Sequence, residues 1–306
     1  MLLDAHAASM RGRRYLIDCR RPLPRNPLDS PAIYEAGKAL FSVTSLQSAT
    51  HATGNLFLDN LPENALNVLR PALVHVSLKH GQLIYERNAR VESVLFPLGA
   101  ILSIVLDMSD GATAEVGIIG REGMSGLGVA LGLSTNKQRA LVQVPDGAYA
   151  IPVEDFRAAL ECEPELKSFA LRYGQAVLTS TSLLSACNSL HPINERCARW
   201  LLMAHDRVAD DLLLLTQDFL SQMLGVRRGG VTLAASALQE AGFISYSRGH
   251  INIRNRAGLE SASCECYGSL ECDWESIMGY SMRKDAVPFK APELGALRPD
   301  GSSEQS

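Results

Sequence analysis

The chain has 306 residues, which is enough for two domains with terminal extensions. Its hydrophobic fraction of 46% and charged fraction of 20% are ordinary for a globular protein, and its net charge of −4 excludes a strongly basic protein that coats nucleic acid. No run approaches about 18 consecutive apolar residues and no secretory signal is visible, so we expect a cytoplasmic protein that does not cross a membrane.

The two ends of the chain are predicted to be extensions. Residues 1–52 contain six arginines between Arg11 and Arg25, interspersed with prolines, and we expect a flexible basic segment. This composition fits either a nucleic-acid contact or an extension without a function of its own. Residues 271–306 contain several prolines, end in GSSEQS and are expected to form a C-terminal tail.

Residues 53–162 are predicted to form a β-roll. After short helices within residues 55–73, the pattern changes to short apolar runs separated by glycine turns. Such a pattern is typical of a β-barrel or jelly roll, which can enclose a single ligand. The expected strands lie at residues 74–78, 83–85, 94–96, 101–106, 116–119, 141–144 and 149–151.

One long helix is predicted over residues 163–190. Its apolar residues recur at three- and four-residue steps, which is close to a heptad repeat and favours a dimer interface. The alternative is a core helix that packs on its own β-roll. The residues of the predicted interface are Leu166, Phe169, Tyr173, Ala176, Leu183, Cys187 and Leu190.

Residues 191–270 contain the pattern of a winged helix-turn-helix, a DNA-reading domain. A helix is predicted after Thr216, whose hydroxyl can cap its first turn. Gly225 suits the tight turn because glycine tolerates positive φ, and Val231 is expected to fill the gap between the two helices. The second helix should span about 228–241 and face inward with Leu233, Ala234, Ala237 and Leu238.

Charge supports DNA binding by this segment. Residues 216–256 hold five arginines against Asp218 and Glu240, a local charge of +3 in a chain of net charge −4. A mildly acidic protein with one basic domain is typical of a regulator with a confined DNA-binding face. The arginines are Arg227, Arg228, Arg248, Arg254 and Arg256.

The predicted DNA contacts lie at the start of the second helix and on the wing. Arg227 and Arg228 open the helix that enters the major groove, where arginine can bind guanine through two hydrogen bonds. Two strands flank a turn at residues 247–250. Arg248 at the tip of this turn and His250 beside it are expected to contact phosphates or the minor groove.

Cysteine spacing argues against a metal site. The seven cysteines are an odd number, and Cys264, Cys266 and Cys272 cluster in ASCECYGSLECDW. This segment has no CxxC pair and no nearby histidine to complete a tetrahedral site, so we expect structural thiols and no metal.

Enzyme motifs are absent from the sequence. There is no glycine-rich phosphate loop, no HExxH and no nucleophile elbow. Asp107, Glu115 and Glu122 lie in or near the predicted strands, but no base or nucleophile pairs with them. We therefore expect no catalytic residues and no enzymatic activity.

The order of β-roll, long helix and winged helix-turn-helix resembles the cyclic-AMP-receptor and Fnr (Crp/Fnr) family of bacterial transcription regulators. The resemblance covers about residues 55–270. It is carried by GIIGREGMSGLGVALG, QRALVQV, PDGAYAIPVEDF and LTQDFLSQMLGVRRGGVT. It implies an α+β fold with a cyclic-nucleotide-binding-type β-roll (a double-stranded β-helix), a dimerisation helix and a C-terminal DNA-binding domain.

The resemblance also implies roles for residues of the DNA-binding domain. Thr216 and Gln217 match positions that contact phosphates, and Arg228 matches the main base-reading arginine. Gly229 stands where many members have a base-reading glutamate, so the preferred half-site should differ. Val231 and Thr232 match packing and backbone positions.

The ligand positions depart from the family pattern. Members that bind cyclic AMP have a glutamate after a glycine, then an arginine and a serine. Here Met124 or Ser125 follows Gly123, and Ala140 follows Arg139. We therefore expect neither a cyclic nucleotide nor, with Cys19 as the one cysteine before the β-roll, an iron–sulfur cluster. Haem remains an alternative, because His75, His80 or Cys162 could ligate its iron. The sequence does not identify the effector.

These patterns predict a dimeric regulator whose β-roll senses an unidentified signal and which binds double-stranded DNA at palindromic promoter sites. The resemblance adds RNA polymerase as an expected partner. The alternative is a cyclic-nucleotide sensor that acts mainly through protein contacts.

Overall fold

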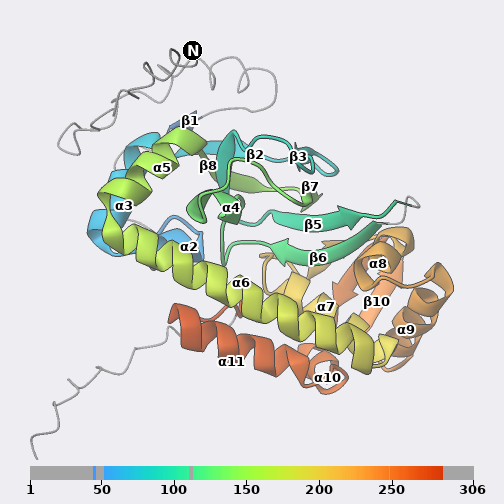
Figure 1. The fold of residues 1–306 in the computed structure, drawn as a ribbon. Coiled ribbons are helices and arrows are strands. Elements are labelled where there is room, and N and C mark those ends of the chain that lie inside the picture. The colour runs from blue at the N-terminus through green and yellow to red at the C-terminus, as the bar shows by residue number, and fades with distance from the viewer. Residues whose placement is uncertain (1–43, 46–51, 110–112, 248, 285–306) are drawn as a thin grey trace, which may run out of the picture.

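The computed structural model describes residues 44–45, 52–109, 113–247 and 249–284, and confirms the α+β fold class (Figure 1). The N-terminal domain is built on two antiparallel four-stranded sheets. One has the order β1 (Thr44–Ser45), β2 (Val74–Ser77), β8 (Gly147–Pro152) and β4 (Ser93–Pro97). The other has the order β3 (Leu83–Tyr85), β7 (Arg139–Val144), β5 (Ile101–Asp107) and β6 (Thr113–Ile119).

Strand β1 falls inside the segment expected to be a flexible extension. Its two residues pair with β2, Thr44 opposite His75 and Ser45 opposite Val74. Residues 1–43 and 46–51, including the arginine-rich run, lie outside the described residues, as do residues 110–112 between two of the predicted strands.

Short helices close the β-roll, and their side chains fill its core. They are α2 (Leu56–Asp59), α3 (Glu63–Leu69), the single 3₁₀ turn η2 (Arg70–Ala72), α4 (Leu127–Ala130) and α5 (Val153–Cys162). Asn55 caps α2 and is fully buried, and its amide donates to the carbonyl oxygens of Pro97 and Gly123. Phe57 places its ring edge-on to Phe169, with ring centres 5.0 Å apart, so the first helices are fixed to the long helix.

The long helix α6 (Pro164–Leu190) is covered along one face by α11 (Cys266–Met278), which runs antiparallel beside it (Figure 1). Trp274 packs edge-on against Tyr173 with ring centres 5.8 Å apart, and the rings of Tyr280 and Phe169 stack. Residues 271–284, expected to lie in a tail, are therefore part of the folded molecule. No helix of the described ranges is both long and apolar enough to cross a membrane.

The C-terminal domain contains the predicted helices and wing. Helix α7 (Ile193–His205) leads to β9 (Leu212–Leu214), α8 (Gln217–Leu224) and α9 (Arg228–Glu240), followed by β10 (Ile244–Ser247), β11 (His250–Ile253) and α10 (Arg256–Ser261). The wing has a third strand that the sequence did not predict, because β9 pairs with β11 in the order β10–β11–β9.

Candidate nucleic-acid interface

Helices α8 and α9 form the predicted helix-turn-helix. Thr216 caps α8, with its hydroxyl accepting a hydrogen bond from the amide of Phe219 at 3.2 Å. Gly225 ends α8 at φ 63°, a left-handed conformation that favours glycine. Val231 is fully buried between the helices. The sequence prediction for this motif is confirmed.

The inward face of α9 differs from the predicted one. Val231, Ala234, Ala235 and Leu238 are buried, whereas Leu233 is 74% exposed and Ala237 is also exposed. At about 100° of turn per residue, Leu233 lies about 200° around the helix from Val231 and so faces away from the core. The predicted inward position of Leu233 is therefore wrong, and α9 presents a large apolar side chain to the outside.

The start of α9 presents basic and small residues. Arg227, Arg228 and Gly229 are exposed, and a side chain added at Gly229 would meet open space among the described residues. Thr232 is partly buried, and its hydroxyl lies 3.2 Å from Gln217 Oε1. This contact links the starts of α8 and α9, so the two predicted DNA-contacting turns hold each other in place.

The wing is an antiparallel hairpin in which Ser247 pairs with His250. His250 is exposed, and Arg254 donates from Nε to Ser245 Oγ at 3.1 Å, so both basic side chains lie on the wing. Arg248, predicted at the tip, lies outside the described residues.

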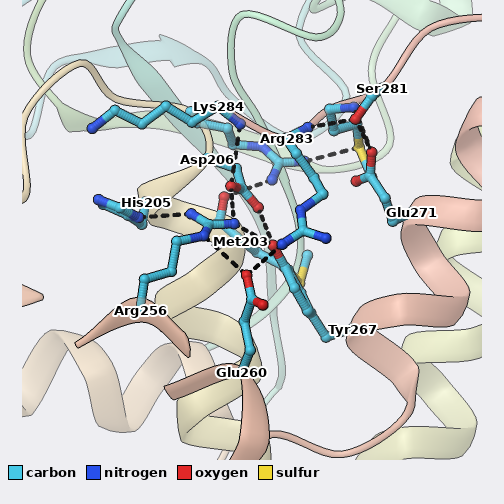
Figure 2. Close-up of polar contacts among 12 residues, drawn as sticks. Met203, His205, Asp206, Arg256, Glu260, Tyr267, Glu271, Ser281, Arg283 and Lys284 are labelled. Carbon is cyan, nitrogen blue, oxygen red and sulfur yellow. Dashed lines mark hydrogen bonds and ion pairs between the residues drawn. The ribbon is translucent and has the colours of Figure 1, made fainter. Parts of the chain in front are cut away.

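Arg256 was counted with the basic DNA-binding segment, but its guanidinium is turned into the protein. It donates to Asp206 Oδ1 at 2.7 Å and to the hydroxyl of Tyr267 at 2.6 Å, and Tyr267 donates to Asp206 Oδ2 at 2.7 Å (Figure 2). The amide of Lys284 also donates to Asp206. This network binds the end of α7, the start of α11 and the segment after it together, and it removes one positive charge from the expected DNA-binding face.

The residues at the predicted ligand positions do not form an anion-binding pocket. Gly123, Met124, Ser125 and Ala140 lie in the packed interior, the last three fully buried. The hydroxyl of Tyr173 donates to the carbonyl of Met124 at 3.0 Å, and a Cβ at Gly123 would collide with that ring.

Arg139, the remaining predicted ligand residue, has another role. It pairs with Asp107 at 2.7 Å, across the neighbouring strands β7 and β5. A cavity of about 50 Å³ between β6, α6 and α11 is lined by Glu122, Tyr173, Arg207 and Trp274 among others. It is small beside the roughly 300 Å³ or more of ordinary ligand sites. The positions that the resemblance aligns with the cyclic-nucleotide site are therefore occupied by packed side chains and by the Arg139–Asp107 ion pair.

The β-roll and the C-terminal domain meet through one partly buried and one buried polar contact. Trp200 of α7 donates to Glu115 Oε1 of β6 at 2.8 Å, and burial raises the pKa of Glu115 to about 7. Arg207, just after α7, forms a buried ion pair with Glu122 at 2.9 Å. Each glutamate thus pairs with a side chain 85 residues away along the chain, a separation at which sequence pattern does not connect the partners.

The residues of the predicted dimer interface are divided between two environments. Leu166, Phe169, Tyr173 and Ala176 are buried in the core of their own chain, together with Trp274 of α11. The remaining members are the partly buried Leu183, the buried Cys187 and the 78% exposed Leu190. In this chain, the predicted interface therefore largely fills the alternative role of a core face.

The cysteine run does have a histidine nearby. Cys266 Sγ lies 3.5 Å from Nδ1 of His191, and Cys264 Sγ lies 3.5 Å from Sγ of Cys187. Cys272 is exposed and lies outside this cluster. Burial raises the pKa of Cys264, and raises that of Cys266 to about 12. The premise of an isolated cysteine run is therefore wrong, because α11 brings these thiols to the end of α6.

Comparisons with known proteins agree with this geometry. A family model described as the Crp-like helix-turn-helix domain matches residues 195–262. The comparison with curated proteins returned no match.

Solved structures share the fold of the chain. A Crp/Fnr-family transcriptional regulator from Eubacterium rectale is 16% identical, with a TM-score of 0.53 over 67% of this chain and 95% of that protein. A protein from Silicibacter pomeroyi assigned as a cAMP-binding regulatory protein is 21% identical, with a TM-score of 0.51 over 69% and 98%. The c-di-GMP responsive global regulator CLP of Xanthomonas campestris is 13% identical, with a TM-score of 0.50 over 63% and 99%.

Residues 195–262 thus match the Crp-like helix-turn-helix domain, and about two thirds of the chain shares the fold of a Crp/Fnr-family transcriptional regulator.

Proposed function

We propose that this protein regulates transcription by binding palindromic DNA sites as a homodimer, and that it contacts RNA polymerase there. The main support is the exposed start of α9, the second helix of a segment that matches the Crp-like helix-turn-helix, where Arg228 is the first residue. In such domains this end of the second helix meets base edges in the major groove. The proposed role is regulation, without a catalytic step.

The proposed DNA-binding face combines three kinds of contact. Arg228 reads a guanine, and Leu233, 74% exposed on the same helix, packs against a thymine methyl group. Thr216, Gln217 and Arg227 contact phosphates beside the groove, while His250 and Arg248 do so from the wing. Gly229 lets the start of α9 approach the DNA closely because it has no side chain.

A base-reading role for Arg228 is tested by quantitative binding to an imperfect palindrome. Arg228→Ala should weaken binding by about 1–3 kcal/mol and relax the preference at one base pair of each half-site. Arg90→Ala is the matched control, because Arg90 is an exposed arginine on the β-roll. Equal affinity and equal base preference in the two variants would remove Arg228 from this role.

We propose that the second copy packs on the outward face of α6. Its exposed residues follow three- and four-residue steps, and they begin with Leu171 and Leu178, which are 46% and 61% exposed. The hydroxyls of Ser182 and Ser189 donate to backbone carbonyls one turn earlier, so they need no other partner when covered. The stripe comprises Leu171, Gln175, Leu178, Ser182, Ser185 and Ser189.

Sedimentation tests this interface. The double variant Leu171→Glu/Leu178→Glu should convert the dimer to a monomer, because four like charges would face one another across the seam. Leu83→Glu is the control, since Leu83 is 46% exposed on β3, away from α6. A dimer that survives the double substitution would contradict this placement.

The effector of the proposed regulator is not a cyclic nucleotide at the family position. The support is the filling of that position by Met124, Ser125 and Tyr173. Cyclic AMP, cyclic GMP and cyclic di-GMP should leave the thermal unfolding temperature unchanged. A saturating rise at micromolar ligand would favour the alternative of a cyclic-nucleotide sensor.

A further inference from the structure

Four metal-binding side chains from two distant segments meet at the corner between α6 and α7. Cys187 lies in the last turn of α6, His191 caps that helix, and Cys264 and Cys266 lie where α11 begins. Their ligand atoms all lie within 4.8 Å of one another. We propose that this cluster binds one zinc ion through three thiolates and one imidazole.

The distances fit a tetrahedral ion. With Zn–S bonds of about 2.3 Å and a Zn–N bond of about 2.05 Å, a tetrahedron has S–S edges of about 3.8 Å and S–N edges of about 3.6 Å. The Cys187–Cys264 separation is 3.5 Å, and the separation from Cys266 Sγ to His191 Nδ1 is also 3.5 Å. Small movements of the side chains would therefore form all four bonds.

The donor set selects the metal. Three thiolates with one imidazole form one of the ordinary structural zinc sites, and soft sulfur ligands disfavour magnesium and calcium. Donor atoms this close together surround a single ion. An iron–sulfur cluster would need its ligands farther apart, because several iron and sulfide atoms would occupy the space between them.

Glu265 orients the histidine for this role. Its Oε1 lies 3.1 Å from His191 Nε2, so Nε2 carries the proton that the carboxylate accepts. The lone pair is then on Nδ1, which is the nitrogen that faces Cys266. A carboxylate behind a histidine ligand is a common arrangement in zinc sites and strengthens the imidazole as a ligand.

Two arginines offset the negative charge of the site. A zinc ion with three thiolates has a net charge of −1, and its formation releases one proton from each cysteine thiol. Arg199 is buried and interacts electrostatically with Cys187, and its Nε has no hydrogen-bond partner within the described ranges. Arg196 interacts with Cys187 and Cys264 in the same way.

The position of the site gives the ion a structural consequence. The ion would join α11 to the corner where the long helix passes into the DNA-binding domain. Arg196 also donates to the carbonyl of Leu224 at the end of α8, at 2.5 Å. Coordination would therefore fix both the C-terminal helix and the root of the helix-turn-helix.

The test uses untagged, full-length protein, stripped of metal under reducing conditions and titrated with cobalt(II). One equivalent should bind, with the visible bands of tetrahedral cobalt and a thiolate charge-transfer band, and zinc should displace it. Cys264→Ser should abolish this spectrum, and Cys272→Ser should keep it, since Cys272 is an exposed thiol of α11 outside the cluster.

Glu265→Gln extends the test to a variant that leaves the four ligands in place. Glu265 is exposed, so the fold should persist, while cobalt affinity should fall about 10–100-fold. The proposal is wrong if wild-type protein gives no thiolate–cobalt band, or if Cys272→Ser loses as much binding as Cys264→Ser. Acid-labile sulfide in the purified protein would also overturn it, because the ligands would then hold a cluster.

Discussion

Glu115 is a carboxylate enclosed between the β-roll and the DNA-binding domain. Its Oε1 accepts from Trp200, and its Oε2 is buried without a hydrogen-bond partner in the described part of the chain. Burial raises its pKa to about 7. The hydrogen bond from Trp200 and the charges of Arg207 and Arg199 oppose this rise without cancelling it. Glu115→Gln removes the titration and keeps an oxygen that can accept from Trp200.

The sign of the pH dependence follows from where the proton is held. The folded protein keeps it up to about pH 7, whereas the unfolded chain releases it near the ordinary value of 4.5. The contribution of Glu115 to the free energy of unfolding therefore falls as pH rises from about 4.5 to about 7, and is constant above that range. At about 1.36 kcal/mol for each unit of pKa difference, the full loss is at most about 3 kcal/mol.

Urea unfolding of wild type and Glu115→Gln at several pH values between about 5 and 8 measures this loss. All other titrating groups are common to both proteins and cancel in the difference. Glu115→Gln should gain stability relative to wild type as pH rises, by up to about 3 kcal/mol, with the gain levelling off above about pH 7. Parallel profiles for the two proteins would refute an enclosed, proton-holding Glu115.

Three further predictions test the packing around α6 and α7. Arg207→Ala leaves Glu122 buried without its partner and should cost about 3–5 kcal/mol of unfolding free energy, with recovery when Glu122 is also replaced by leucine. Trp274→Ala should cost about 3–5 kcal/mol in denaturant unfolding, and a cost below about 1 kcal/mol would mean that α11 does not cover α6. Gly123→Val should cost about 1–3 kcal/mol through collision with Tyr173, and Tyr173→Ala should offset part of that cost in the double variant. Strictly additive losses would contradict this contact.

The helix-turn-helix could be predicted from the sequence because its signals are local. The hydroxyl of Thr216, the left-handed Gly225 and the buried Val231 lie within 16 residues of one another, and each acts where the chain turns. Leu233 follows the helical spacing of the predicted inward stripe, but it lies about 200° around the helix from the buried Val231. Counting turns from Val231 would have placed it outside.

The face of α6 that meets a second copy could not be chosen from periodicity. Leu166, Phe169 and Tyr173 satisfy a heptad pattern whether they face a partner or their own core. The choice depends on Trp274 and Tyr280, which come from a segment whose composition suggested a tail. Their packing against α6 is a contact between residues about 100 positions apart along the chain, and local pattern carries no information about it.

The same limit applies to the cysteine cluster. Cys187 and His191 are 73 or more residues away from Cys264 and Cys266, so ligand spacing could not connect the two pairs. The one local clue was the four-residue spacing of Cys187 and His191, which places both at the end of one helix and next to each other.

The packing of α8 against β6 limits how far the C-terminal domain can rotate relative to the β-roll. Ile101 and Ile118 of the β-roll share one apolar cluster with Met223 and Leu224 of α8. A rotation of this domain away from the β-roll would expose the cluster to water. The cost in free energy is about 25 cal/mol for each square ångström of apolar surface uncovered. A signal that repositions the C-terminal domain must therefore supply at least this free energy. The same contact means that a fragment beginning at residue 191 would expose an apolar surface to water.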